Sequence, residues 1–179
     1  MKQTRHLLIA LALGTMLTSC GASVSTATVT GPAAYVDPYI GSGGHGHVFV
    51  GASVPFGAIQ AGPQNIHKGW DWCSGYHHSD SIVIGFAHTH LSGTGCTDMG
   101  DVQIMPYTGE LRSKRGRQED IGGSCSSYYS HDNESVSPGY YSLKMDNGVR
   151  IEMTASTRTA LHRITYPEAE GRRLLINLE

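Results

Sequence analysis

Residues 69–101 read GWDWCSGYHHSDSIVIGFAHTHLSGTGCTDMGD and contain both tryptophans of the 179-residue chain. Within this stretch, Ser81–Phe86 is a short apolar run of the kind that forms a buried strand. The segments on either side are rich in Trp, His and Asp, and loops of this composition on a rigid scaffold commonly present a binding surface. We therefore expect a buried strand, continuing to about residue 88, between two loops that carry functional groups.

The rest of the chain also predicts strands rather than helices. Beyond the first twenty residues no segment has the 3.6-residue periodicity of an amphipathic helix. Residues 51–60 are expected to form a turn that leads into a short strand, and further strands are expected near residues 102–107, 158–166 and 172–178. A loop through Pro63 should lead to the tryptophans. The 23 glycines have no collagen-like period and therefore indicate turns and close backbone approaches. The fold class predicted is all-β, an antiparallel β-sandwich with long Gly-rich loops.

The clearest local signal is a hairpin around Asp146-Asn147-Gly148. A three-residue loop places the apolar residues of the two strands opposite one another, whereas a two-residue Asn-Gly loop would mix apolar and charged residues on one face. We therefore predict a three-residue loop with Gly148 in the left-handed conformation. The same register sets Lys144 opposite Arg150, a mild like-charge cost that Glu152 partly offsets.

The first twenty residues resemble a bacterial lipoprotein signal peptide. They have a basic start, an apolar core too short to span a membrane, and the sequence Leu17-Thr18-Ser19-Cys20. Lipid on Cys20 would attach the chain to a membrane; the alternative is an ordinary secretory signal. We divide the chain into this signal (1–20), a flexible tether (21–34) and one domain (35–179).

Composition restricts the remaining chemistry. The formal charge is −2 with no basic stripe, so nucleic acid is not an expected partner. The loop Gly41–His47 lacks the Lys and the following helix of a phosphate-binding loop. With Cys20 lipidated, three cysteines remain, so at most one internal disulfide can form; whether Cys73 pairs with Cys96 or Cys125 is open.

Two histidines, His88 and His90, are spaced so that both would point to one face of a strand, a spacing that some zinc hydrolases use. A third ligand could come from His45, His47, His77 or Asp98. The simpler interpretation is a pair of hydrogen-bonded histidines at a strand end, or a polar contact to substrate.

Trp70, Asp71 and Trp72 together are typical of a sugar site, because indole faces stack on sugar rings and a carboxylate accepts bonds from hydroxyls. Either tryptophan could instead belong to the core. A pair of carboxylates for glycoside hydrolysis could come from Asp71, Asp80, Asp98 and Asp101, although loop caps and turns are the commoner role of such residues. No G-x-S-x-G motif is present, which disfavours a serine hydrolase.

Five stretches, in order, carry a resemblance to a known family. They are YVDPYIG (35–41), GGHGH (43–47), GASVPFG (51–57), WDWCSGYH (70–77) and GFAHTHLSGTGC (85–96). The chain closely resembles the N-terminal domain of glycoside hydrolase family 92, the calcium-dependent exo-acting α-mannosidases. The resemblance implies a β-sandwich packed on a helical catalytic domain and an inverting mechanism, in which one carboxylic acid protonates the leaving oxygen and one carboxylate activates water.

The resemblance also implies which residues bind substrate. Acid, base and calcium ligands would come from the helical domain, so no catalytic or metal role is assigned here. The β domain would form one wall of the sugar site for a mannose-containing glycan through Gly44, His45, Trp70, Asp71, Trp72, His88 and His90. The implied location is lipid-anchored in the bacterial cell envelope, in the periplasm or at the outer membrane.

The last expected strand, within RRLLINLE, looks buried and has no terminating signal, so we expect a truncated sequence that exposes apolar surface and is inactive alone. The alternatives are a non-catalytic carbohydrate-binding lipoprotein and a zinc-dependent hydrolase that uses His88 and His90.

Overall fold

The computed structural model describes residues 29–97, 100–114, 121, 123–167 and 170–178. The predicted signal peptide with Cys20, most of the predicted tether, and Asp98 lie outside these residues. Within the described part of the chain, no helix has both the length and the apolar character needed to cross a bilayer.

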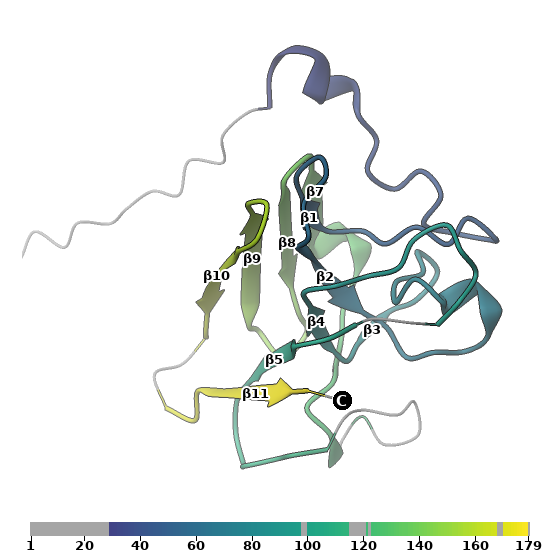
Figure 1. Ribbon diagram of the computed structural model, residues 1–179. Helices are drawn as coiled ribbons and strands as arrows, with labels where there is room; N and C mark the ends of the chain where they lie inside the picture. Colours follow the sequence, from purple (N-terminus) through teal and green to yellow (C-terminus); the bar gives the residue numbers. More distant parts are fainter. Residues whose placement is uncertain (1–28, 98–99, 115–120, 122, 168–169, 179) are drawn as a thin grey trace, which may run out of the picture.

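Strands and short 3-10 turns make up the regular structure, which confirms the all-β prediction (Figure 1). The 3-10 turns labelled in the order of the chain are η1 (Gly31–Tyr35), η2 (Trp70–Trp72) and η4 (His131–Asn133). The strands are β1 (Ala52–Ser53), β2 (Gln60–Gln64), β3 (Ile82–Val83), β4 (Gly85–Ala87), β5 (Gln103–Tyr107), β6 (Ser127–Tyr128), β7 (Glu134–Ser137), β8 (Tyr140–Lys144), β9 (Arg150–Ala155), β10 (Ala160–Thr165) and β11 (Arg173–Asn177).

Two antiparallel sheets pack face to face around one core. The five-stranded sheet has the order β1-β2-β4-β5-β11 and the four-stranded sheet has the order β10-β9-β8-β7, with a separate β3-β6 pair. Phe86 from the first sheet and Tyr141 from the second are both fully buried, with ring centroids 6.4 Å apart. Apolar side chains from the inner faces of both sheets fill the space between them, as in a β-sandwich.

The hairpin β8–β9 has the register expected from the sequence. Leu143 pairs with Ile151, and Lys144 pairs with Arg150. The Met145 amide donates to the Val149 carbonyl at 2.9 Å, so the loop between them has three residues. Gly148 has φ +84°, in the left-handed region, as predicted. The apolar face determined this register, because a slip of one residue would have turned every apolar side chain outward.

Substitution of Gly148 by alanine is expected to lower the free energy of unfolding by about 1–2 kcal/mol, because L-residues are strained at this φ. The added Cβ would also lie 3.1 Å from Pro167 Cγ. Urea denaturation measures the change, and Ser135→Ala, at an exposed position of β7, is the control. Equal stability of both variants would contradict the assigned conformation.

The prediction of a single strand over 81–88 is wrong, because this segment forms two strands, β3 and β4. β3 pairs with β6, whereas β4 pairs with β2 and β5, and the chain changes partner at Ile84. The buried Gln103 side chain donates to Ile84 O at 2.6 Å and occupies the space beside Gly85, where a Cβ would come within 2.0 Å of Gln103 Nε2. A polar side chain inserted from another strand therefore divides a run that looks continuous in sequence.

The expected loop through Pro63 is also corrected, since β2 extends to Gln64 and Pro63 pairs with Phe86. A proline lacks the N–H that a second neighbouring strand would need. On its other side β2 pairs with β1 only at Gln60 and Ala61, so no bond to β1 is lost at Pro63.

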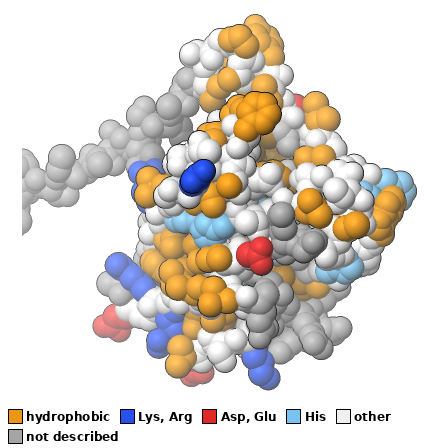
Figure 2. Space-filling view, in the orientation of Figure 1, with side chains coloured by type: hydrophobic (Ala, Val, Ile, Leu, Met, Phe, Trp, Pro, Cys, Tyr) orange, Lys and Arg blue, Asp and Glu red, His pale blue; other side chains and the backbone are white. Residues whose placement is uncertain are grey.

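The terminal strand β11 is half-exposed rather than buried. It pairs with β5, but its alternate residues Leu174 and Ile176 face outward, and Leu161 on β10 is exposed as well. Hydrophobic side chains gather on the surface where β10 and β11 lie (Figure 2). The apolar run LLINL predicts a buried strand, but among the described residues no segment covers this face. The sequence of a strand does not reveal which elements pack against it.

Candidate functional site

Three loops from separate parts of the chain meet beside the sandwich. We call them the glycine loop (41–47), the tryptophan loop (69–76) and the histidine loop (88–97). The Gly93 amide donates to His47 O at 2.7 Å, and the Trp70 indole donates to Gly95 O at 2.9 Å. The sequence predicted these three segments as binding elements, and the structure brings them into contact.

Trp70 and Asp71 lie at the point where the glycine and tryptophan loops touch. Trp70 is 60% exposed, and the His47 ring packs edge-on against it with centroids 4.1 Å apart. His45 Nδ1 lies 2.6 Å from Asp71 Oδ1. The hydrogen bond from His45 holds the pKa of the half-buried Asp71 carboxyl below its ordinary value, so Asp71 is an ionised acceptor beside an exposed indole.

The glycine loop is held in an unusual conformation where it meets the indole. Gly44 and the non-glycine His47 both have φ +54°. Positive φ at a histidine is uncommon and costs energy, and such strain often occurs at functional sites. A Cβ at Gly44 would meet nothing within 4 Å, so backbone conformation, not crowding, requires glycine there.

Trp72 and Asp80 have mainly structural contacts. The Trp72 indole donates to Asp80 Oδ2 at 2.9 Å, its ring stacks on His77 at 4.2 Å, and Lys68 Nζ lies over it at 5.7 Å. The buried Asp80 carboxylate also bonds Lys68 Nζ at 2.9 Å and accepts the backbone amides of Ser81 and Ile82. Its oxygens are therefore engaged in holding the tryptophan loop, and the face of Trp70 is the more accessible platform.

His88 and His90 have different neighbours. His88 Nε2 lies 2.9 Å from Nε2 of His162 on β10, whereas His90 is 4% exposed and stacks on Phe49 with centroids 4.9 Å apart. His90 Nδ1 bonds to the Gln60 carbonyl at 2.8 Å, so this nitrogen carries the proton. No three His, Cys, Asp or Glu residues in the described ranges are grouped so that they could hold a metal ion.

A small cavity of about 40 Å³ lies between the tryptophan and histidine loops. Trp72, Cys73, His90 and Thr97 are among its lining residues. The buried His90 Nε2 has no hydrogen-bond partner in the protein. The cavity has room for a water molecule that could donate to this nitrogen.

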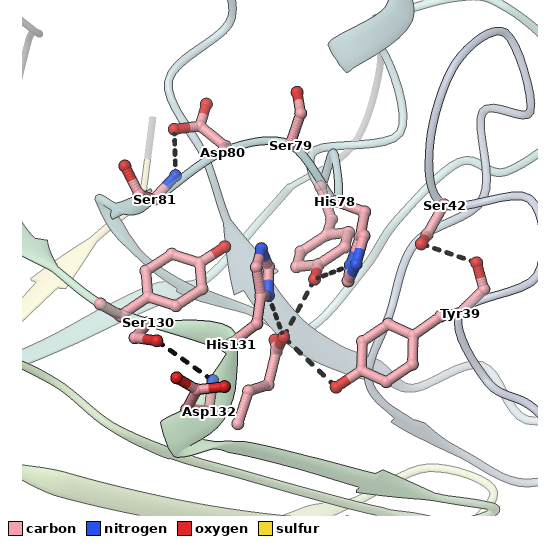
Figure 3. Close-up of polar contacts among 12 residues, drawn as sticks. Tyr39, Ser42, His78, Ser79, Asp80, Ser81, Ser130, His131 and Asp132 are labelled. Carbon is pink, nitrogen blue, oxygen red and sulfur yellow. Dashed lines mark hydrogen bonds and ion pairs between the residues drawn. The ribbon is translucent and has the colours of Figure 1, made fainter.

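A buried carboxylate, Glu134 at the start of β7, lies beneath the loops. Its side chain is fully buried and accepts hydrogen bonds from the hydroxyls of Tyr141 at 2.7 Å, Tyr76 at 3.1 Å and Tyr39 at 3.3 Å. His131 Nδ1 lies 2.7 Å from the same carboxylate. In Figure 3, Tyr39 and His131 lie on different sides of the carboxylate at which the dashed lines from both side chains end.

This Glu134 cluster connects the base of the glycine loop to that of the tryptophan loop. Tyr39 precedes the glycine loop and Tyr76 ends the tryptophan loop, while the His78 amide donates to Ser42 O at 2.8 Å. Burial, and then the charge of Glu134, raise the pKa of Tyr39 and Tyr76 well above the ordinary value, so both hydroxyls stay protonated and donate.

Sequence reasoning missed Glu134, His131 and His162 as members of this region. Glu134 and His131 lie in a polar segment with no motif, and His162 lies in a predicted strand far along the chain. The alternation of residues 160–165 could have placed His162 on one face of β10, but no local signal pairs it with His88.

The architecture is that of a two-sheet, all-β domain with a loop-built surface at one side. A family model, the glycosyl hydrolase family 92 N-terminal domain, matches residues 35–179. The chain belongs to this family of glycosidases, and what it contains is the family's N-terminal domain.

Individual relatives agree with this assignment. A protein of Arthroderma benhamiae described as an uncharacterized secreted glycosidase is 32% identical over 142 residues, which cover 74% of this chain and 17% of that protein. The family GH92 α-mannosidase BT3965 of Bacteroides thetaiotaomicron, solved with mannoimidazole, has TM-score 0.78 and 41% identity, covering 82% of this chain and 19% of its own. The inverting mannosidase BT2199 from the same organism has TM-score 0.63 and 26% identity, covering 83% and 20%. The chain thus spans about a fifth of these relatives' length.

Proposed function

We propose that this chain is the N-terminal part of an inverting exo-α-mannosidase that trims terminal mannose from glycans, and that its three loops form one wall of the sugar site. The observation that carries the proposal is the meeting of the glycine, tryptophan and histidine loops around Trp70, whose exposed indole lies beside the ionised Asp71. The apolar face of a pyranose ring can stack on the indole, while a sugar hydroxyl donates a hydrogen bond to the neighbouring carboxylate.

The acid, the base and the calcium ion of the proposed reaction are assigned to the rest of the longer protein. The residues described here do not fit a metal site, since no suitable group of ligands is present among them. The role proposed for this chain is therefore to bind and orient the sugar. A lipid on Cys20 would hold the protein at the cell envelope, and detergent phase partitioning of a Cys20→Ala variant tests this anchor.

Mannose binding to the chain is expected to weaken roughly 5-fold when Trp70 is replaced by alanine, because the stacking contact contributes about 1 kcal/mol. Titration calorimetry or NMR with methyl α-mannoside measures the change. Tyr128→Ala, which removes an exposed aromatic ring from β6, is the matched control and should bind like the parent. Equal affinity of the Trp70 variant and the parent would contradict the proposed wall.

The purified chain is expected not to hydrolyse an aryl α-mannoside, with or without added calcium, because the acid and base are assigned elsewhere. A chromogenic substrate assay measures this directly. Turnover that survives purification, and is lost on Asp71→Asn, would instead place the catalytic machinery in this chain.

A further inference from the structure

Cys96, in the histidine loop, has a chain neighbour on each side that bonds to residues between 67 and 70. On one side of it, Gly95 O accepts the Trp70 indole N–H at 2.9 Å. On the other side, Thr97 Oγ1 lies 3.3 Å from Nε2 of His67, which precedes the tryptophan loop. Cys96 itself is exposed. One chain neighbour of Cys96 is thus bonded to the tryptophan loop, which contains Cys73, and the other is bonded to a residue just before that loop.

Cys73 lies in the tryptophan loop, on the opposite side of the contact between the two loops from Cys96. It follows directly after η2, its amide donates to Trp70 O at 3.1 Å, and its side chain is 3% exposed. It lines the 40 Å³ cavity together with His67 and Thr97. Thr97, which directly follows Cys96, and its partner His67 therefore line the same cavity as Cys73.

Cys125 has a different environment. Its Sγ donates to the Arg112 carbonyl at 3.5 Å, and its amide donates to Lys114 O. These contacts belong to the segment that follows β5, and none of them involves the tryptophan loop. The Cys125 thiol is therefore buried against the segment 112–114 and not against either of the two loops.

We propose that Cys73 and Cys96, free thiols in this structure, form a disulfide that clamps the histidine loop to the tryptophan loop. This covalent modification would fix the relative position of the two loops and so pre-organise the surface around Trp70. The cross-link itself does not depend on the proposed function; only its consequence for sugar binding rests on it.

The chemistry requires an oxidant of the disulfide class, such as oxidised glutathione or an oxidoreductase with an active-site disulfide. The exposed Cys96 thiolate attacks one sulfur of that disulfide, and the other sulfur leaves as a thiolate. Cys73 then loses its proton and attacks Cys96 Sγ in the mixed disulfide, which releases the second thiolate of the oxidant. Overall two thiols lose two electrons and two protons, and one disulfide of the oxidant is reduced to two thiols.

The protonation behaviour of Cys73 agrees with this order of events. Burial raises the pKa of the Cys73 thiol, and the neighbouring Cys96 raises it further. A buried thiol with a raised pKa is a poor first nucleophile, so the exposed Cys96 is the one that meets the external oxidant.

The test is cross-link mapping of the full chain in a Cys20→Ser background, equilibrated in a glutathione redox buffer and digested without reduction. Trypsin leaves both cysteines in one peptide, residues 69–112, which should be lighter by two hydrogen atoms. Chymotryptic cleavage within it should give two pieces that separate only on reduction. After denaturation, iodoacetamide should label Cys125 alone. A cross-link to Cys125, or labelling of all three cysteines, would overturn the proposal.

Thermal melting gives an independent readout. Reduction should lower the melting temperature by roughly 5–10 °C, because the cross-link closes a loop of moderate length. Cys125→Ser should keep this shift and Cys96→Ser should abolish it. A shift that persists in Cys96→Ser would also count against the cross-link. Neither readout uses sugar, so a failed mannose titration leaves this result unaffected.

Discussion

Replacement of Glu134 by alanine is expected to lower the free energy of unfolding by about 3–5 kcal/mol. The substitution removes the common acceptor of three tyrosine hydroxyls and the partner of His131. Each buried donor left without an acceptor costs about 1–3 kcal/mol, and not all of them can reach water. This places Glu134→Ala among the most damaging single substitutions in the chain.

Chemical denaturation measures the loss, with Asp132→Ala as the matched control. Asp132 is an exposed acid two residues away that uses its backbone amide, not its carboxylate, to bond Ser130. That control should change stability by less than about 0.5 kcal/mol. Glu134→Gln keeps one carbonyl acceptor and should fall between the two. If Glu134→Ala were as stable as the control, the cluster would not hold the loops.

The effect should also reach the site. Because Tyr39 precedes the glycine loop and Tyr76 ends the tryptophan loop, loss of their acceptor should expose the two tryptophans of that loop to quenchers more strongly than in the parent. Acrylamide quenching of tryptophan fluorescence reports this under conditions where the variant is still folded. Unchanged quenching together with lower stability would confine Glu134 to a role in the core.

Acidification from pH 6.5 to pH 4 is expected to remove roughly 3 kcal/mol of stability through His90 alone, since each pKa unit corresponds to about 1.4 kcal/mol. Burial lowers the pKa of His90 from 6.5 to about 4, although bonds to backbone carbonyls oppose the shift. In the unfolded chain His90 takes up its proton near pH 6.5, but in the folded protein only near pH 4. The contribution of neutral His90 to the free energy of unfolding is therefore complete above pH 6.5 and is lost as the pH falls toward 4.

The pKa of His162 is lowered to about 4 as well, first by burial and then by His88, so it acts in the same direction. Urea midpoints measured across this range should fall steadily with pH. His90→Gln should flatten the curve, and His67→Gln, which removes an exposed imidazole, controls for the loss of a histidine. A curve of the same slope in His90→Gln would contradict a neutral, buried His90.

The parts of the fold that were predicted correctly depend on short-range patterns. The β8–β9 register follows from alternation over a few residues, and the five motif stretches identify the family without any geometry. The single strand over 81–88 was predicted wrongly because Gln103, which divides it, comes from another strand. Likewise the exposure of Leu174 and Ile176 depends on what lies against β11 and not on their own apolar character.

The sequence by itself determined that the chain is an all-β domain of the glycosyl hydrolase family 92 type and which segments carry its aromatic, histidine and aspartate residues. Only the tertiary structure decided that Trp70 is exposed while Trp72 is stacked on His77, and that Asp80 is bound by Lys68 and by backbone amides. It also decided that Cys96, rather than Cys125, is bracketed against the loop of Cys73. The physical reason is that alternation and turn chemistry act between near neighbours in sequence, whereas burial and partner choice are set by residues brought together from distant parts of the chain.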